Sequence, residues 1–149
     1  IQRADIKKGQ RILDLGCGWG SMTLTIARLF PDSQVTALSH SSTQQQYIQS
    51  IANQEQLTNV KTLLADVKDL QLQEKYDRII SIEMVEHVRN HEKLLDQLHQ
   101  AMHVEGLLFI HHFCHDHLAY SFDKKKSWMA KHFFRPAMKK SSFSLDGTF

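Results

Sequence analysis

The sequence has few of the residues that mark specialised classes of protein. Its 149 residues include two cysteines, Cys17 and Cys114, too few for the disulfide framework of a small secreted domain. It has no signal-peptide pattern and no run of about 18 apolar residues, so we expect no membrane-spanning helix. The net charge of +2 is too small to indicate a nucleic-acid partner. These absences favour a globular domain in the reducing cytoplasm.

Short apolar runs alternate with helix-like patterns along the chain, and no hairpin turns separate them. This alternation predicts an α/β fold with a doubly wound, mainly parallel sheet. We expect strands over residues 11–15, 35–38, 60–64, 76–82 and 107–113. The helices are expected to begin near Ser21 and stop at Pro31, to include residues 47–52, and to run over residues 94–102 with an end near Gly106.

Three glycines at every second position, Gly16, Gly18 and Gly20, join the first expected strand to the first expected helix. Such spacing predicts a tight turn whose backbone can lie against a ligand. Asp14 stands two residues before the first glycine. The pattern differs from the GxGxxG of dinucleotide-binding proteins and resembles motif I of class I S-adenosylmethionine (SAM) methyltransferases. An ordinary tight turn between strand and helix is the alternative.

Polar residues follow the second and third expected strands. Enzymes that bind NAD usually place an acid after the second strand, but Ser39 and Gln44 are neutral, which disfavours a nicotinamide cofactor. These two side chains could bond a ribose, or belong to a serine-rich helix cap. Asp66, beside Val67, could accept a bond from an adenine amino group, or form an Asx turn.

The fourth expected strand ends in Glu83, Glu86 and His87, spaced i, i+3 and i+4. If the chain is helical there, the three side chains share one face. Clustered, partly buried carboxyl groups should have raised pKa values, which suits them to act as a general base or to stabilise a cation. A solvated helix start is the alternative.

Histidines cluster at the end of the fifth expected strand, but their pattern argues against a metal site. Strand alternation places His111 and His112 on opposite faces, and neither HExxH nor CxxC accompanies them. We therefore expect no metal, and one of the four histidines facing the site. The four are His111, His112, His115 and His117.

The last quarter of the chain has a different character. Residues 124–140 contain seven Lys or Arg and no acid. We expect a core at 1–115 and a partial substrate lid at 116–149. A solvated lid or helix is the favoured interpretation of the basic segment, and weak contact with an anionic membrane surface is the alternative.

Together these motifs resemble the cyclopropane-fatty-acid-synthase-like SAM methyltransferases, in particular the branch of coclaurine and related N-methyltransferases. The likeness covers about residues 10–134. It is carried by residues 14–20, 35–39, 65–66, 81–87, 111–115 and 128–134. The resemblance implies a Rossmann-like class I methyltransferase core, and we expect that core to be truncated at both ends.

The resemblance also implies SAM as cofactor and a role for each motif. The glycine turn would hold the methionine part, and the residues after the second and third strands would hold ribose and adenine. Glu86 and His87 match residues that bind and deprotonate an amine in the N-methyltransferase branch. In cyclopropane synthases the matching glutamate helps hold a bicarbonate. The candidate cofactor residues are Asp14, Gly16, Gly18, Gly20, Ser39, Gln44, Asp66 and Val67, and the candidate catalytic residues are Glu83, Glu86 and His87.

The activity expected from the resemblance is methyl transfer from SAM to a small-molecule acceptor, with an amine nitrogen in first place. Transfer to unsaturated phospholipid acyl chains is one alternative. A non-catalytic SAM-binding fragment is the other.

Overall fold

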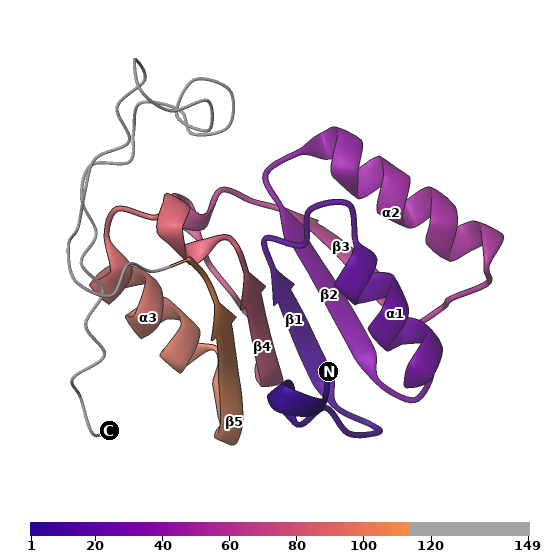
Figure 1. Cartoon of the computed structure of the whole chain (residues 1–149), viewed down its shortest axis with the longest axis horizontal. Coiled ribbons are helices and arrows are strands. Elements are labelled where there is room, and N and C mark those ends of the chain that lie inside the picture. The colour runs from indigo at the N-terminus through magenta and orange to yellow at the C-terminus, as the bar shows by residue number, and fades with distance from the viewer. Residues whose placement is uncertain (114–149) are drawn as a thin grey trace.

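A computed structural model describes residues 1–113 of the chain, which form a layered α/β unit (Figure 1). Residues 114–149 lie outside the described residues. The expected lid at 116–149, the basic segment 124–140, His115 and His117 all fall in that range.

Five parallel strands form one sheet in the order β3-β2-β1-β4-β5, which confirms the predicted fold class. Because every strand runs in the same direction, all five carboxyl ends meet at one edge of the sheet. The strand order reverses between β1 and β4, the position where parallel sheets bind ligands. The strands are β1 (Arg11–Leu15), β2 (Gln34–Ser39), β3 (Val60–Leu64), β4 (Tyr76–Ile82) and β5 (Met102–His111).

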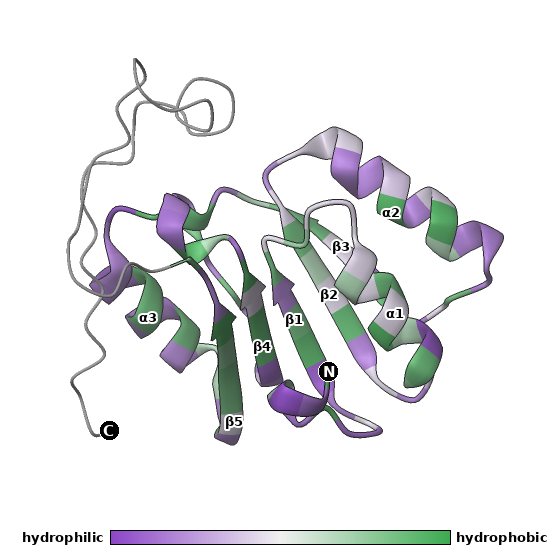
Figure 2. Ribbon diagram, in the orientation of Figure 1, coloured by the Kyte–Doolittle hydropathy of each residue, from purple (hydrophilic) through white to green (hydrophobic). Residues whose placement is uncertain are grey.

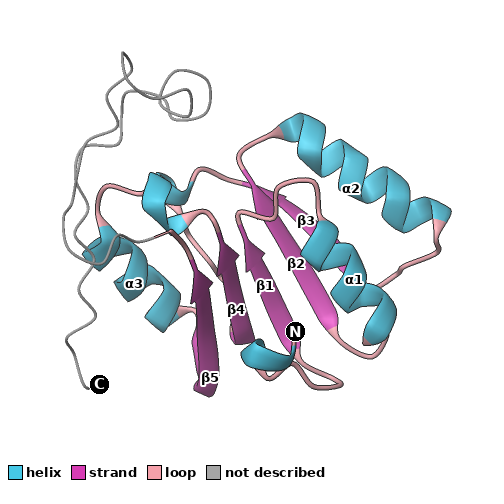
Figure 3. Ribbon diagram, in the orientation of Figure 1, coloured by secondary structure: helices cyan, strands magenta, loops and turns pink. Residues whose placement is uncertain are grey.

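Helices cover both faces of the sheet (Figure 3). α1 (Ser21–Leu29) and α2 (Ser42–Gln54) pack on one face, and α3 (His91–Gln100) packs on the other. Three short 3-10 turns complete the described part: η1 (Gln2–Ala4), η2 (Val67–Asp69) and η3 (Val85–His87). None of the helices among residues 1–113 is long and apolar enough to cross a membrane.

Strand alternation divides the core into two layers. Leu13 and Ile79 pack with Leu98 of α3, whereas their neighbours Ile12 and Ile80 pack in the cluster beneath α1. All five side chains are fully buried. The central strands are therefore hydrophobic on both faces, which Figure 2 shows as green arrows between more polar helices.

The boundary between α3 and β5 differs from the prediction. The sequence pattern extended the last helix through Met102 to Gly106, but α3 ends at Gln100 and both residues belong to β5. Met102 pairs with Tyr76 of β4 at the start of an irregular stretch of the ladder. A Cβ on Gly106 would lie 2.8 Å from the carbonyl oxygen of His103, so this glycine permits the irregular strand rather than ending a helix.

Candidate functional site at the carboxyl edge of the sheet

The glycine turn after β1 has an unusual backbone. Gly16, Gly18 and Gly20 have φ values of 79°, 53° and 81°, in the left-handed region that L side chains rarely adopt. The backbone N–H groups of Gly16 and Cys17 both donate to the carbonyl oxygen of Leu38, each at 3.0 Å. The turn is thus fixed against the end of β2.

The three glycines serve two different purposes. A Cβ on Gly16 would lie 2.4 Å from Cγ of Met84, and one on Gly20 would lie 2.5 Å from Cγ1 of Ile48. These two positions must lack side chains so that neighbouring elements can pack. At Gly18 an added Cβ would meet nothing within 4 Å. Gly18 is therefore the glycine whose backbone is open to a ligand.

Asp14 lies inside the protein below this turn. It is 3% exposed, and the hydroxyl of Thr23 on α1 donates to its Oδ2 atom at 2.6 Å. Burial raises the pKa of Asp14 to about 6, against the lowering effect of that hydrogen bond. The carboxyl group ties the first turn of α1 to the end of β1.

Ser39 and Gln44 are joined directly. The Ser39 hydroxyl donates to Oε1 of Gln44 at 2.6 Å and accepts a bond from the backbone N–H of Ser41 at 3.0 Å. Ser41 also caps α2 by accepting a bond from the backbone N–H of Gln44. The amide nitrogen of Gln44 is left as a neutral donor at the end of β2.

Asp66 and Val67 follow β3. The Asp66 side chain accepts a bond from the backbone N–H of Lys68 at 3.0 Å and so caps η2. This is the Asx turn that is the alternative to a contact with adenine. Asp66 is exposed and Val67 is half-buried. Both follow β3, which is the neighbour of β2 in the sheet, so they lie on the same side of the site as Ser39 and Gln44.

The acidic cluster after β4 does not form the expected α-helical face. Glu83 has a φ of 53°, and residues Val85–His87 form a 3-10 turn. Burial raises the pKa of Glu86, with further raising contributions from the charge and hydrogen bonding of Glu83. The raised pKa expected for a partly buried carboxyl in this cluster is thus confirmed at Glu86. His87 is exposed.

Of the two described histidines in the histidine-rich stretch, His111 joins this cluster. Its Nδ1 atom lies 2.8 Å from Oε1 of Glu83, while Nδ1 of His112 contacts the carbonyl oxygen of Phe113. Within residues 1–113, no group of three or more His, Cys, Asp or Glu side chains is arranged to hold a metal ion.

Met84 is the residue that the sequence reasoning missed. Its side chain fills the space beside Gly16, so the acidic loop packs directly on the glycine turn. Thr23 is a second such residue, because its hydroxyl bonds Asp14. No spacing rule signals either contact, because both join elements that are distant in the sequence.

A parallel sheet of this order, with a left-handed glycine turn after its first strand, is a Rossmann-like fold. Residues 1–142 match the family described as mycolic acid cyclopropane synthetase. The chain belongs to this family, which confirms the resemblance drawn from the motifs.

The relatives that match are longer than this chain. It is 40% identical over 136 residues to (S)-coclaurine N-methyltransferase of Papaver somniferum, covering 90% of this chain and 39% of that protein. It is 31% identical over 112 residues to cyclopropane-fatty-acyl-phospholipid synthase of Escherichia coli (strain K12), covering 74% of this chain and 28% of that one.

Among solved structures, a crystal structure of coclaurine N-methyltransferase bound to N-methylheliamine and SAH matches with a TM-score of 0.84 and 38% identity. The match covers 92% of this chain and 41% of that one. The chain therefore spans about two fifths of the length of these N-methyltransferases.

Proposed function

We propose that this chain binds SAM and belongs to an enzyme that transfers the SAM methyl group to a small-molecule acceptor, an amine nitrogen in first place. The observation that carries the proposal is the contact between Gly16 and Met84. It sets a glycine turn with an open backbone at Gly18 directly beside an acidic cluster, at the point where the strand order reverses. The proposed donor site and the proposed acceptor site would thereby be adjacent.

The residues present suit SAM. The open backbone at Gly18 would lie along the methionine part, with Gly16 and Gly20 shaping the turn and buried Asp14 supporting it. Ser39 and Gln44 offer neutral hydrogen bonds for ribose hydroxyl groups. Asp66 and Val67 would meet the adenine.

The acidic cluster would bind and deprotonate the acceptor. When bound, SAM supplies a methyl group already activated on a sulfonium, so the chain's residues mainly position the acceptor nitrogen in line with it. The carboxylates of Glu86 and Glu83 would attract an ammonium. His87 would take the proton that the nitrogen loses at or before transfer, because a neutral imidazole has a ring nitrogen that can accept a proton.

The direct test is calorimetry of this chain with SAM and with S-adenosylhomocysteine. We expect both to bind. Absence of binding by either would contradict the proposal. Binding of SAM without transfer to any amine or lipid would favour a non-catalytic SAM-binding fragment instead.

The role of Glu86 gives a separate prediction. Replacing Glu86 by Gln should lower turnover about 10²–10⁴-fold and leave SAM affinity nearly unchanged, because the group acts on the acceptor. Turnover with a series of amines and calorimetry with SAM measure the two effects. Glu92→Gln, at an exposed position in the first turn of α3, is the matched control. Equal loss of turnover and SAM affinity in Glu86→Gln would rule out this assignment.

A second candidate is transfer to unsaturated phospholipid acyl chains. The family match and the likeness to the E. coli synthase favour it. Residues 124–140, in the proposed lid at 116–149, would then meet anionic lipid. Co-sedimentation with anionic liposomes, strong at low salt and lost at high salt, would support this candidate over a soluble amine acceptor.

We also propose a cytoplasmic location. It is supported by the scarcity of cysteine and by Cys17, which is a buried free thiol. Expression as a fluorescent fusion, followed by fractionation, would test it.

A further inference from the structure

The outer side of α2 carries no charged side chain. Residues 33–54 contain no Asp, Glu, Lys or Arg, although 23% of the whole chain is charged. The shorter helix α3, on the other face of the sheet, exposes Glu92, Lys93 and Asp96. Exposed helix faces of soluble proteins usually carry charged as well as polar residues, whereas the centres of protein interfaces are depleted of charge. The surface of α2 therefore differs from that of an ordinary solvated helix.

Two aromatic side chains stand on the same surface. Trp19, in the glycine turn before α1, is 57% exposed, and Tyr47 of α2 is 44% exposed. Their ring centroids lie 5.3 Å apart at an interplanar angle of 88°, which is the edge-to-face arrangement. Because the two rings contact each other, a binding partner would lose little side-chain freedom in meeting them. Tryptophan and tyrosine are enriched among the residues that carry the binding energy of an interface.

Uncharged polar side chains extend this surface along α2. They are exposed, they follow the side of the helix on which Tyr47 lies, and each can both donate and accept hydrogen bonds. We call the aromatic pair and these side chains the neutral face. Its residues are Trp19, Thr43, Gln46, Tyr47, Ser50, Asn53 and Gln54.

The neutral face ends at a compensated charge. Arg28, in the last turn of α1, donates to both carboxylate oxygens of Glu55 at the end of α2, at 2.6 and 2.7 Å. In Figure 1, α2 forms the outer flank of the helix layer, and no other element of residues 1–113 lies beyond it. The neutral face is thus open to a binding partner and has no unpaired charge where α2 ends.

We infer that the neutral face is an interface between two copies of this chain. In a two-fold dimer a surface meets its own copy, so a charge near the axis would face the same charge. Amide and hydroxyl groups avoid that repulsion, and each can bond its equivalent in the second copy. The basic segment 124–140 suits the neutral face less well, because it would find no carboxylate there. The inference does not depend on the proposed function, which calorimetry with SAM tests by itself.

The size of the neutral face sets the expected strength of the dimer. At about 1.5 Å per residue, the 13 residues of α2 extend about 20 Å. Stable interfaces bury about 800 Å² on each partner, and one helix face with an exposed tryptophan is at the small end of that class. We therefore expect a dissociation constant in the micromolar range.

Sedimentation velocity of the full chain, from about 1 to 200 µM, tests for such a dimer. Trp19→Ser and Tyr47→Ser should each raise the dissociation constant about tenfold or more, because each removes an aromatic anchor. Phe113→Ser, at a 75% exposed position just beyond β5, is the matched control and should leave association unchanged. A chain that is monomeric over the whole range would overturn the inference, as would equal effects of the three substitutions.

Added charges test whether the partner is a second copy. Gln46→Lys with Ser50→Lys in one chain, and Gln46→Glu with Ser50→Glu in another, should each give a monomer, because like charges then meet across the axis. An equal mixture of the two variants should form a mixed dimer, because opposite charges then meet. A variant that failed to fold would not recover in this way, and circular dichroism checks that both are folded. Association that survives the added charges, or a mixture of folded variants that stays monomeric, would overturn the inference.

Discussion

At the scale of single residues, residues of the same type have different roles because their surroundings differ. Gly16 and Gly20 are needed for packing against Met84 and Ile48, whereas Gly18 faces open space. Glu83 is tied to His111, whereas the pKa of Glu86 is raised mainly by burial. The sequence motifs alone do not distinguish Gly18 from the other two glycines, or Glu83 from Glu86.

The space beside Gly18 is open, as it is beside Gly9, so the effects of alanine at the two positions can be compared. Gly18→Ala and Gly9→Ala both place a methyl group at a positive φ with nothing within 4 Å, so each should lower the free energy of unfolding by about 1–2 kcal/mol. Gly9 lies in the turn before β1, at the opposite edge of the sheet. Only Gly18→Ala should weaken SAM binding in calorimetry, because its methyl occupies the proposed cofactor space. Equal SAM affinity in both variants would contradict the placement of the cofactor.

The buried Asp14 predicts a pH dependence of stability. Its pKa rises from 3.8 to about 6 on folding, so the folded state holds the proton more tightly and this group's contribution to stability is lost as pH rises from 4 to 7. The loss is up to about 3 kcal/mol, from about 1.4 kcal/mol for each pKa unit. Asp14→Asn keeps an acceptor for Thr23 and does not titrate.

Urea unfolding at pH 4 and pH 7 measures this effect. The free energy of unfolding of Asp14→Asn, relative to that of the original chain, should be higher at pH 7 than at pH 4. Asp32→Asn, in the exposed turn after α1, controls for changing a carboxyl into an amide. If the stability difference between Asp14→Asn and the original chain were the same at both pH values, the raised pKa would be wrong.

At the scale of elements, α1 is held by a side chain from another part of the fold. The side-chain amide of Asn59, immediately before β3, donates to the carbonyl oxygens of Ala27, Phe30 and Ser33 at 3.0–3.2 Å. Asn59 is 5% exposed, so these carbonyls have little access to water. The end of α1 and the turn into β2 therefore depend on β3.

Asn59→Ala should lower the free energy of unfolding by about 2–3 kcal/mol, since it removes the side-chain donor to the carbonyl oxygens of Ala27 and Ser33. Asn53→Ala removes an amide on exposed α2, where its partner is Gln49, and should cost under about 0.5 kcal/mol. Chemical denaturation of the two variants measures the difference. Similar losses would show that Asn59 is not the anchor of α1.

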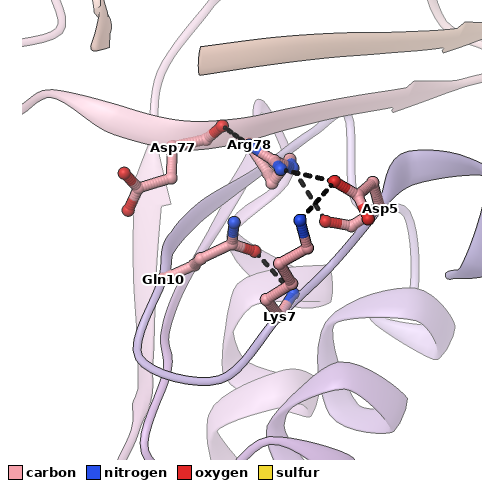
Figure 4. A network of polar contacts seen from close by, with 5 residues as sticks. All are labelled: Asp5, Lys7, Gln10, Asp77 and Arg78. Atoms are coloured by element: carbon pink, nitrogen blue, oxygen red, sulfur yellow. Dashed lines mark hydrogen bonds and ion pairs between the residues drawn. The ribbon is translucent and has the colours of Figure 1, made fainter. Parts of the chain in front are cut away.

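At the scale of the whole molecule, the two edges of the sheet have different tasks. A polar network at the amino edge joins η1 to β4 (Figure 4). The guanidinium of Arg78, 7% exposed, donates to the carbonyl oxygen and to Oδ2 of Asp5, each at 3.0 Å, and to the carbonyl oxygen of Asp77 at 2.7 Å. The candidate site lies at the opposite, carboxyl edge.

This separation predicts that stability and ligand binding can be changed independently. Arg78→Leu should lower the melting temperature by roughly 5 °C, because it leaves the Asp5 carbonyl without its buried donor, and should leave SAM affinity unchanged. Lys7→Leu removes an exposed cation from the same Asp5 oxygen and should have a much smaller effect. Thermal unfolding and calorimetry test both. A large loss of SAM affinity in Arg78→Leu would mean that the two edges are coupled.

The pattern of apolar residues along the sequence was sufficient to predict most of the helices and strands. Four of the five strands fall within one residue of the expected ranges at each end, because short and mainly apolar segments such as residues 12–15, bounded by turns, are typical of strands in a parallel sheet. The pattern failed at Met102, where a residue spaced four after Leu98 continues the helical stripe but pairs with Tyr76 instead. Strand pairing outweighed helical spacing there.

The sequence by itself determined the class of fold, the family and the identity of the candidate site residues, because these depend on periodicity and on motifs of neighbouring residues. Only the tertiary structure decided which contacts those residues make. The contacts of Gly16 with Met84, Asp14 with Thr23 and Glu83 with His111 join elements that are separate in the sequence. A parallel sheet brings the carboxyl ends of its strands to one edge, and the burial, charge and open space found there follow from packing rather than from spacing along the chain.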